Sequence, residues 1–515
     1  MLAHLYGEQI RHQLDHALGE LREREFVHPN VGSDSNTAAL DDDEYMFKHA
    51  MTQEVAYGSI LLARRKELHL RIAEAIEQLF PERLAELSAT LGFHFDRAES
   101  SVRAESYLHR AADSARANFA NAEAISFYKA AIRHAGHLLE ASDDSASRAR
   151  LVRLNESLGD VLTLSGEQEQ ACAAFAEALK RCEMQDAVGR SSFHRKIGLC
   201  HSLKRNYAES ARAFDQADTE LDAAEEAKSL PWWEEKLQIQ LERMHLFYWQ
   251  GMVPEMRALA GAFEAAIGRH GTPTQRSKFL MLLSLSLLMG SRFRPSRECV
   301  ELGRRAVEAS GAVTDPTDKC HAVFVFGLVQ LWSGAFAESV DCCSAGLELA
   351  ERVGDLVRQA RCLNYRALGH RRLNEVTGAR TDAEQTLALA SKLRMVEYIA
   401  MAKANLGWVA WKEARSHDVE KFGEEALALW HGMEDPLRFD WIALWPLIAA
   451  ASEQGSLPKA IDQMRGLFAE GQYPLADEVM ADCRAAIDCA KRDDQEALRR
   501  CLDRALQTAC AFHYL

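Results

Sequence analysis

The chain has 515 residues, of which 61 are Lys or Arg and 76 are Asp or Glu, so its formal net charge is −15. This negative charge argues against nucleic acid or an anionic membrane as the main ligand. A hydrophobic content of 48% excludes wholesale disorder, and 29 Gly with 11 Pro exclude a collagen-like or mucin-like stalk. The length suits three or four domains, or one long repeat array.

The sequence predicts a cytoplasmic protein that does not cross a membrane. The first residues, Met1 to Tyr6, lack the positive start and the apolar run of a signal peptide. The longest apolar stretch, residues 279–289, is too short for a membrane helix, which needs about 20 residues. The 12 Cys are scattered and none form a Cys-x-x-Cys pair, which is typical of free thiols in a reducing compartment.

Residues 1–60 predict the end of a winged helix. Leu14 to Leu21 has the pattern of a short amphipathic helix. Residues 25–29 and 44–48 predict two short strands, and the polar loop between them, residues 30–43, has no core-forming power. Residues 61–100 then predict linker helices, and residues 101–515 predict helical repeats.

A motif follows the second predicted strand. It consists of Phe47, His49, Ala50, Thr52, Gln53, Glu54, Val55, Ala56 and Tyr57, then Arg65, Leu68 and His69, then Leu91, His94 and Ala98. This motif resembles the junction in large bacterial signalling ATPases of the STAND type, notably the adenylate/guanylate cyclase–ATPase–tetratricopeptide proteins. In those proteins it joins a winged helix to the repeats. The resemblance covers residues 14 to 135 well, and the remainder only as generic repeats.

The resemblance implies a junction that packs against an ATPase core and carries no chemistry. It assigns Phe47, His49, Glu54 and Tyr57 to this interdomain junction, with Phe47, Val55 and Tyr57 in a core and His49 as the interdomain contact. The chain departs from the family because it contains no Gly-x-x-x-x-Gly-Lys-[Ser/Thr] phosphate loop and no cyclase domain. We therefore expect no enzymatic activity. The chain is then a C-terminal piece of a longer protein, has a wrong start site, or has lost the enzyme parts.

Internal repeats dominate the rest of the chain. Four positions recur 39 residues later: Gly159, Ala171, Phe175 and Ala178 correspond to Gly198, Ser210, Phe214 and Ala217. This order resembles the tetratricopeptide pattern of two antiparallel helices, in which small residues lie where the helices cross and a bulky one fills the gap to the next unit. The sequence thus predicts an all-α, right-handed superhelix of about ten helix pairs.

The residues with catalytic or metal-binding potential favour structural roles. His12 and His16 are four apart on one helix face, but Gln13 stands where a zinc peptidase needs Glu. Cys342 and Cys343 lie in a repeat helix that does not offer the electropositive niche of a catalytic thiol. The sequence therefore predicts no catalytic residue, no metal and no cofactor.

A surface is the remaining candidate site. In tetratricopeptide arrays the first helix of each pair lines the concave groove, and three neighbouring units place aromatic and basic residues there. This predicted strip comprises Phe324, Trp332, Arg366, His370, Asn374, Trp408, Trp411 and Lys412. Arg and Trp often anchor interfaces, and such a groove suits an extended or helical peptide with acidic character. The alternative is that the tryptophans pack between helices.

The sequence as a whole predicts a non-catalytic scaffold or sensor arm that binds a protein and regulates a STAND-type ATPase or nucleotide cyclase. The partner is a protein or peptide in the groove, or the chain's own upstream ATPase/cyclase domains. A first alternative is the C-terminal fragment of a multidomain cyclase or ATPase. A second is the arm of a STAND-type transcriptional regulator, which the net charge of −15 disfavours. Self-association is a further expectation, because an open array leaves apolar end faces.

Overall fold

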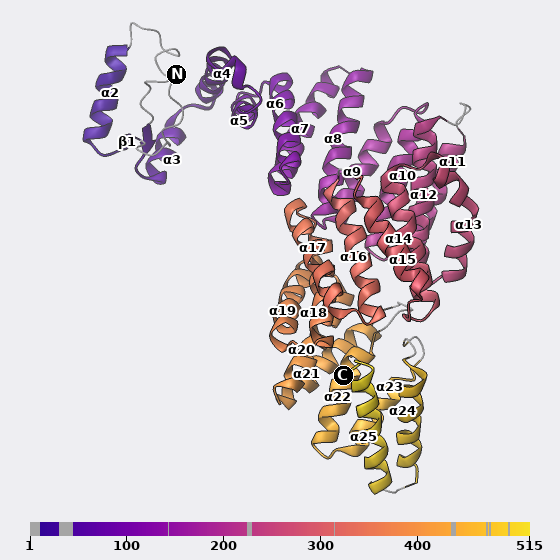
Figure 1. Ribbon diagram of the computed structural model, residues 1–515. Helices are drawn as coiled ribbons and strands as arrows, with labels where there is room; N and C mark the ends of the chain where they lie inside the picture. Colours follow the sequence, from indigo (N-terminus) through magenta and orange to yellow (C-terminus); the bar gives the residue numbers. More distant parts are fainter. Residues whose placement is uncertain are drawn as a thin grey trace. The chain divides into compact units, whose positions relative to one another are not determined.

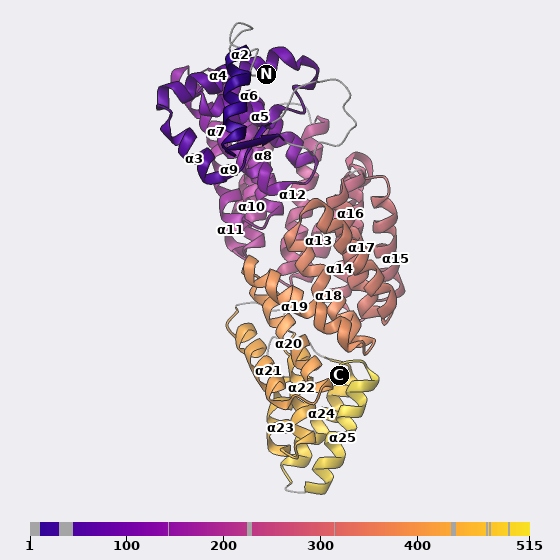
Figure 2. The same ribbon diagram turned by 90° about the vertical axis from the view of Figure 1, so that its left-hand side faces the viewer.

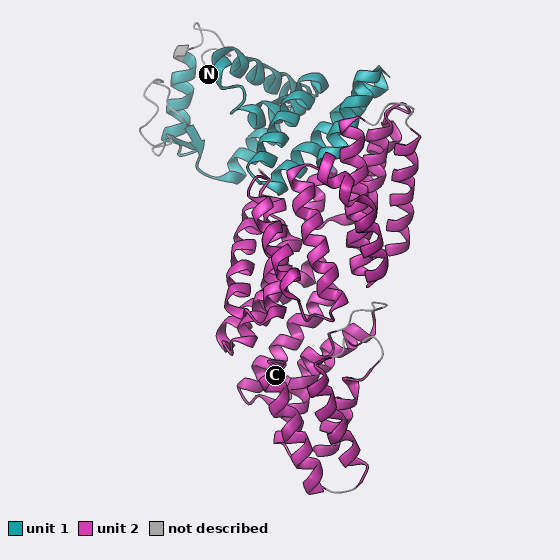
Figure 3. Ribbon diagram, turned by 45° about the vertical axis from the view of Figure 1, so that its right-hand side comes forward, with its two compact units in different colours: residues 1–158 teal, residues 159–515 magenta. Residues whose placement is uncertain are grey.

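The computed structural model describes residues 11–29, 45–142, 144–223, 229–313, 315–433, 439–469, 472, 475–492 and 495–515. The chain divides into two compact units, Met1–Leu158 and Gly159–Leu515 (Figure 3). The boundary falls inside one helix, α8 (Ser145–Leu164). No helix among these residues is long and apolar enough to cross a membrane. The boundaries expected at residues 60 and 100 stay predictions.

Unit 1 starts with a helix and a two-stranded antiparallel sheet, and helices follow (Figure 1). Besides α8, its elements in chain order are α2 (Arg11–Glu23), β1 (Val27–Pro29), β2 (Tyr45–Phe47), α3 (Ala50–Ser59), α4 (Leu62–Leu79), η2 (Pro81–Arg83), α5 (Ser88–Arg97), α6 (Ser101–Ala117) and α7 (Asn121–Ala141). Val27 lies opposite Phe47 in the sheet. The predicted helix and both predicted strands are confirmed, and the polar loop at 30–43 lies outside the described residues.

The expected core around the junction motif is wrong. Phe47, Val55 and Tyr57 are 42%, 71% and 37% exposed, and α3 contains no buried residue. The physical reason is that α3 packs lightly, against β2 and, through Tyr57, against His69 and Arg65 of α4. These contacts leave its apolar side chains largely exposed. The part of the motif in residues 47–57 is therefore exposed, whereas His69 and Leu91 are buried.

Unit 2 is an array of antiparallel helix pairs. Its helices after α8 are α9 (Gln168–Arg181), α10 (Ala187–Leu203), α11 (Tyr207–Asp222), α12 (Leu230–Trp249), α13 (Val253–His270), α14 (Pro273–Gly290), α15 (Arg297–Ser310), α16 (Pro316–Ser333), α17 (Phe336–Val353), α18 (Leu356–Arg372), α19 (Val376–Leu393), α20 (Val396–Lys412), α21 (Ser416–His431), α22 (Trp441–Glu453), α23 (Leu457–Gly466), α24 (Asp477–Ala490) and α25 (Gln495–Ala511). The predicted all-α helical-repeat class is confirmed. Figures 1 and 2 show α22 to α25 grouped at the C-terminal end of this unit.

The repeat spacing read from the sequence has a physical basis in the helix crossings. The Ser210 hydroxyl donates to the Gly198 carbonyl at 2.8 Å, twelve residues away, and Ser339 donates to Gly327 in the same way. Each bond ties the second helix of a pair to the first. Phe214 also joins the cluster formed with α12, so it fills the gap to the next pair as predicted.

The close helix crossing at Gly198 predicts a stability effect. A Cβ there would lie 2.7 Å from the Phe214 ring, closer than packed atoms approach. We expect Gly198→Ala to lower the free energy of unfolding by about 1–3 kcal/mol through overpacking. The matched control is Gly261→Ala, where nothing lies within 4 Å and better helix propensity stabilises by up to about 1 kcal/mol. Urea unfolding followed by circular dichroism measures both, and a stabilised Gly198→Ala protein would contradict the assignment.

The first helices of the pairs form the inner layer of unit 2. α12 packs on α14, α14 on α16, α16 on α18 and α18 on α20. Among the described residues, the second helices of neighbouring pairs make no comparable contact with one another. Successive pairs therefore lie closer together on the side of the first helices, which makes that side the inner face of the array.

Candidate functional site

The inner face carries a cluster of aromatic and basic side chains, which we call the inner groove. It takes residues from α12, α16, α18 and α20. These are His245, Tyr248, Trp249, His321, Phe324, Arg361, Tyr365 and Tyr398, and they surround a cavity of about 20 Å³. A water molecule needs about 10–15 Å³ of such space, so the groove is closed to anything much larger in this state.

The rings of the inner groove touch one another across neighbouring helices. His245 lies 5.7 Å from His321 and 5.8 Å from Trp249, measured between ring centres. The Arg361 guanidinium lies over the Trp249 ring at 5.0 Å. Such cation–π contacts fix the direction of both side chains and contribute about 0.5–2 kcal/mol. The Nε of Arg361 is buried and has no hydrogen-bond partner among the described residues.

The inner groove is electrically neutral at its histidines and tyrosines. Burial lowers the pKa of His245 to about 3 and lowers that of His321 as well. Burial also raises the pKa of Tyr248 to about 12. These groups therefore stay uncharged near pH 7, where imidazole nitrogens and phenols act as hydrogen-bond donors and acceptors. His245 and Tyr248 nevertheless keep some exposed surface. A narrow groove that protein encloses on most sides explains why these side chains have shifted pKa values and yet keep some exposed surface.

One side chain crosses the groove from a distant part of unit 2. Arg205 lies in the turn after α10, at a left-handed φ of 62°. Its guanidinium lies 5.5 Å above the Trp249 ring and forms an ion pair with Glu397 of α20. Arg205 and Arg361 thus contact the same indole ring, and the ion pair links the α10 turn to α20 beside the groove.

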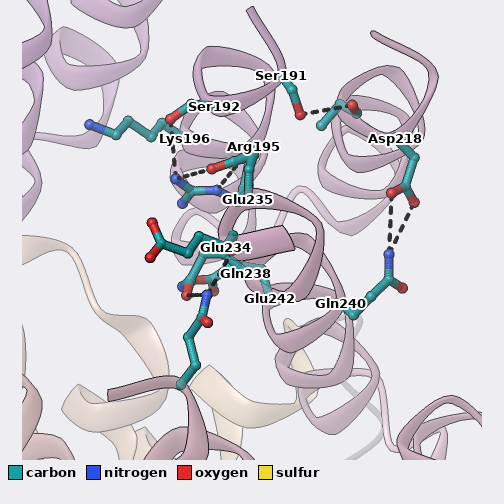
Figure 4. Close-up of polar contacts among 12 residues, drawn as sticks. Ser191, Ser192, Arg195, Lys196, Asp218, Glu234, Glu235, Gln238, Gln240 and Glu242 are labelled. Carbon is teal, nitrogen blue, oxygen red and sulfur yellow. Dashed lines mark hydrogen bonds and ion pairs between the residues drawn. The ribbon is translucent and has the colours of Figure 1, made fainter. Parts of the chain in front are cut away.

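Beside the groove, ion pairs join successive first helices (Figure 4). The Arg195 Nε of α10 donates to Glu235 of α12 at 2.7 Å. Lys278 of α14 donates to Glu242 of α12 at 2.7 Å. Gln238 donates to the same Glu242 at 2.9 Å. Because Glu235 and Glu242 are buried, these contacts hold the first helices in one register and position the groove residues.

The structure disperses the predicted strip. Phe324 and Trp408 are only 5% and 1% exposed. Phe324 lines the inner groove, and whether either residue binds a partner stays a prediction. They pack between helices because the first helices carry apolar side chains on both flanks. Trp332 belongs to the hydrophobic core as a partly buried side chain. Asn374 instead takes a turn at φ 60°.

The remaining strip residues form two separate groups. The Arg366 Nε donates to Asp382 at 2.8 Å, and the His370 Nε2 lies 3.6 Å from the same carboxylate. On α20, the Trp411 indole donates to Glu453 at 3.0 Å, and the Lys412 ammonium lies 4.5 Å from the Trp411 ring. Whether these groups bind a partner stays a prediction.

Sequence reasoning missed most of the inner groove. The last turns of α12 contain His245, Tyr248 and Trp249. The repeat pattern of this helix pair is degenerate, so the sequence does not show which of its positions face the groove. The run His245-Leu-Phe-Tyr-Trp249 is the signal that could have identified them. Side chains three and four residues apart share one helix face, so His245, Tyr248 and Trp249 lie together. Three ring side chains on one face are more than packing two helices against each other requires.

In unit 1, the junction residues lie in different settings. Tyr57 Oη lies 2.9 Å from His69 Nε2, and His69 Nδ1 lies 2.8 Å from His94 Nδ1. Burial lowers the pKa of His94 to about 4, so one neutral ring donates to the other. His49 precedes α3 without capping it, and Glu54 is exposed. The role of these residues as an interdomain junction stays a prediction.

Within the described ranges, no group of three or more His, Cys, Asp and Glu could hold a metal ion. The buried thiols Cys200 and Cys343 have pKa values that burial raises to about 12, so they are not activated nucleophiles. The fold and the inner groove together define a helical-repeat scaffold.

No protein-family model matches the sequence, and no curated protein matches it either. Solved structures resemble the fold at low identity. The Rap protein complexed with competence and sporulation factor is 16% identical, with a TM-score of 0.47 over 61% of this chain and 86% of that chain. The apo form of RapI is 14% identical, with a TM-score of 0.44 over 62% of this chain and 86% of that one.

A third similar structure is a signal transduction ATPase with numerous domains and a tetratricopeptide repeat sensor, from Pyrococcus horikoshii. It is 12% identical, with a TM-score of 0.38 over 76% of this chain and 56% of that chain. At these values the likenesses say nothing about function, and the fold class rests on the helix pairs themselves.

Proposed function

We propose that the chain is a non-catalytic scaffold that binds a segment of a protein partner along the inner face of unit 2. The carrying observation is the inner groove, where aromatic rings, neutral imidazoles and the unpartnered Arg361 Nε converge. A polypeptide offers backbone carbonyls and side chains to such groups at every residue. The Arg205–Glu397 ion pair lies beside the groove, against Trp249, and we expect partner binding to open that contact.

Site-specific crosslinking in the source cells tests this proposal. A benzoylphenylalanine at Trp249 replaces one aromatic residue of the inner groove by another, and the matched control carries it at the exposed Arg304 of α15. We expect a protein adduct from position 249 and none from position 304. The double variant Trp249→Ala, Arg361→Ala should weaken binding of the captured partner at least tenfold, because such residues anchor interfaces. Adducts from the control position alone would reject the inner face.

We further propose that partner binding regulates a STAND-type ATPase or nucleotide cyclase. The resemblance of residues 47–57 to the junction of those proteins supports it. An antibody against the repeats measures the native product. A band far above 57.6 kDa places the regulated enzyme on the same chain, and a band at that mass means a separate partner. ATP hydrolysis by the purified chain would contradict a non-catalytic role.

A further inference from the structure

A second cavity lies at the other end of the same first helices, which we call the C-terminal cavity. It measures about 410 Å³, within the range of sites for small molecules. It lies where α14, α16 and α18 end and where α22, α24 and α25 meet them. The side chains that matter here are Arg292, Phe293, Arg294, Trp332, Arg372, Phe439, Trp441, Glu478 and Tyr514.

Aromatic rings form the walls of the C-terminal cavity. Trp332 lies 4.9 Å from Phe293 and is stacked on Phe439 at 6.2 Å, measured between ring centres. Trp441 lies 5.3 Å from Tyr514. The indole nitrogen of Trp332 is buried and has no hydrogen-bond partner among the described residues. Aromatic walls of this kind can stack on a planar ring of a ligand, and the Trp332 N–H can donate a hydrogen bond to that ligand.

Arg372, a partly buried arginine, faces this cavity without a counter-ion among the described residues. The Arg372 guanidinium lies 5.0 Å from the Trp441 ring and 5.4 Å from the Tyr514 ring. Among the described residues its hydrogen bond is a long one, to the Phe512 carbonyl at 3.5 Å. Its Nε has no acceptor, and no carboxylate of the described residues forms an ion pair with it.

The neighbouring Arg371 adds to the unbalanced positive charge. It donates to the carbonyls of Ile442 at 3.0 Å and Tyr514 at 3.1 Å, and it too has no carboxylate partner among the described residues. Burial lowers the pKa of Arg372 to about 10 and also lowers that of Arg371. The negative ends of α14, α16 and α18 offset only part of this charge, because helix dipoles act within the last turn.

The mouth of the C-terminal cavity is also positive. Arg292 and Arg294 are exposed there and flank the buried Phe293. Glu478, also exposed, is the carboxylate among the described lining residues. The lining thus presents three arginines against one glutamate, and this charge attracts anions towards the opening.

We propose that the C-terminal cavity binds a small organic anion that carries a planar aromatic ring. The ring lies among Trp332, Trp441 and Phe439, and the anionic group accepts hydrogen bonds from Arg372. Arg292 and Arg294 guide the ligand in. A phosphate or a carboxylate fits this chemistry equally, since a guanidinium binds both in the same forked geometry. This site is separate from the inner groove and does not depend on the proposed partner binding.

Isothermal titration calorimetry on the full chain tests the proposal with matched probes. Adenosine 5′-monophosphate is compared with uncharged adenosine, and indole-3-acetate with uncharged indole-3-acetamide. We expect saturable binding of at least one anion below about 1 mM, and at least tenfold weaker binding of its neutral partner. The anion that binds identifies the source as phosphate or carboxylate. No binding by either anion, or equal binding of anion and neutral partner, overturns the proposal.

Variants locate the binding. Because Arg292 and Arg294 are exposed, the double variant Arg292→Gln, Arg294→Gln should fold normally and bind the anion about tenfold more weakly. Arg372→Lys keeps a charge but loses the fork, and a loss of tenfold or more is expected. The control is Arg297→Gln on the same surface, which does not line the cavity and should bind like the natural chain. Unchanged affinity in the double variant also overturns the proposal, even if Arg372→Lys fails to fold.

Discussion

Replacing Lys278 by Met is expected to lower the free energy of unfolding of unit 2 by about 3–5 kcal/mol, the usual cost of leaving a buried charge without its partner. The Lys278 ammonium lies 2.7 Å from Glu242, whose side chain is 4% exposed. Burial by itself would raise the pKa of Glu242. The charge of Lys278 and its hydrogen bond outweigh that effect and hold the pKa at about 2.

The matched control is an exposed pair of the same length. Lys459 lies 2.8 Å from Glu420, and both side chains are 37% exposed. Lys459→Met should cost about 1 kcal/mol or less, because solvent screens such pairs. Urea unfolding at pH 7, followed by circular dichroism, compares the two variants. Equal losses would mean that Glu242 is solvated in solution, and the ion pairs beside the inner groove would then contribute little to its position.

Acidification from pH 7 to pH 5 is expected to destabilise unit 2 by about 2 kcal/mol through His245 alone. Burial holds the pKa of His245 at about 3, below its unfolded value of 6.5. Between these values the unfolded state binds a proton that the folded state does not. The stability is therefore fully present above pH 6.5 and is lost as the pH falls towards 3. His321, whose pKa burial also lowers, adds to the same slope.

The variant His245→Gln separates this contribution from that of the carboxylates. It should lose about 2 kcal/mol of the difference in unfolding free energy between pH 7 and pH 5. The control His417→Gln replaces an exposed histidine of α21 and should keep the full difference. If both variants keep it, His245 titrates in the folded protein near its ordinary pKa. The inner groove would then be open to water rather than closed.

Local spacing explains why the repeats could be read from the sequence. Gly198 and Ser210 are twelve residues apart because one turn separates two helices that must cross closely, and the hydroxyl–carbonyl bond needs that distance. The hairpin of unit 1 was predictable for a similar reason, since Val27 and Phe47 belong to short runs flanked by polar residues. In both cases the contacts form between elements adjacent in the chain.

The candidate sites were harder to predict because burial depends on elements far apart. Trp408 and Trp411 look alike in the sequence, three residues apart on one helix. In the fold Trp408 is 1% exposed, whereas the Trp411 indole reaches the exposed side and donates to Glu453 of α22. Val55 shows the reverse. It is apolar within a motif expected to be core, yet it is 71% exposed because α3 buries none of its residues against the described elements of unit 1.

The sequence by itself determined the helical-repeat class, the crossing contacts within pairs and the absence of a phosphate loop motif, since each depends on residues at short, regular spacing. Only the tertiary structure decided where a charge is paired and where it is left unbalanced. Arg205 meets Trp249 and Glu397, and Arg372 meets Trp441 and Tyr514, through the packing of many helix pairs. The free-energy cost of burying a charge depends on every group around it, and a local sequence pattern does not show which groups these are.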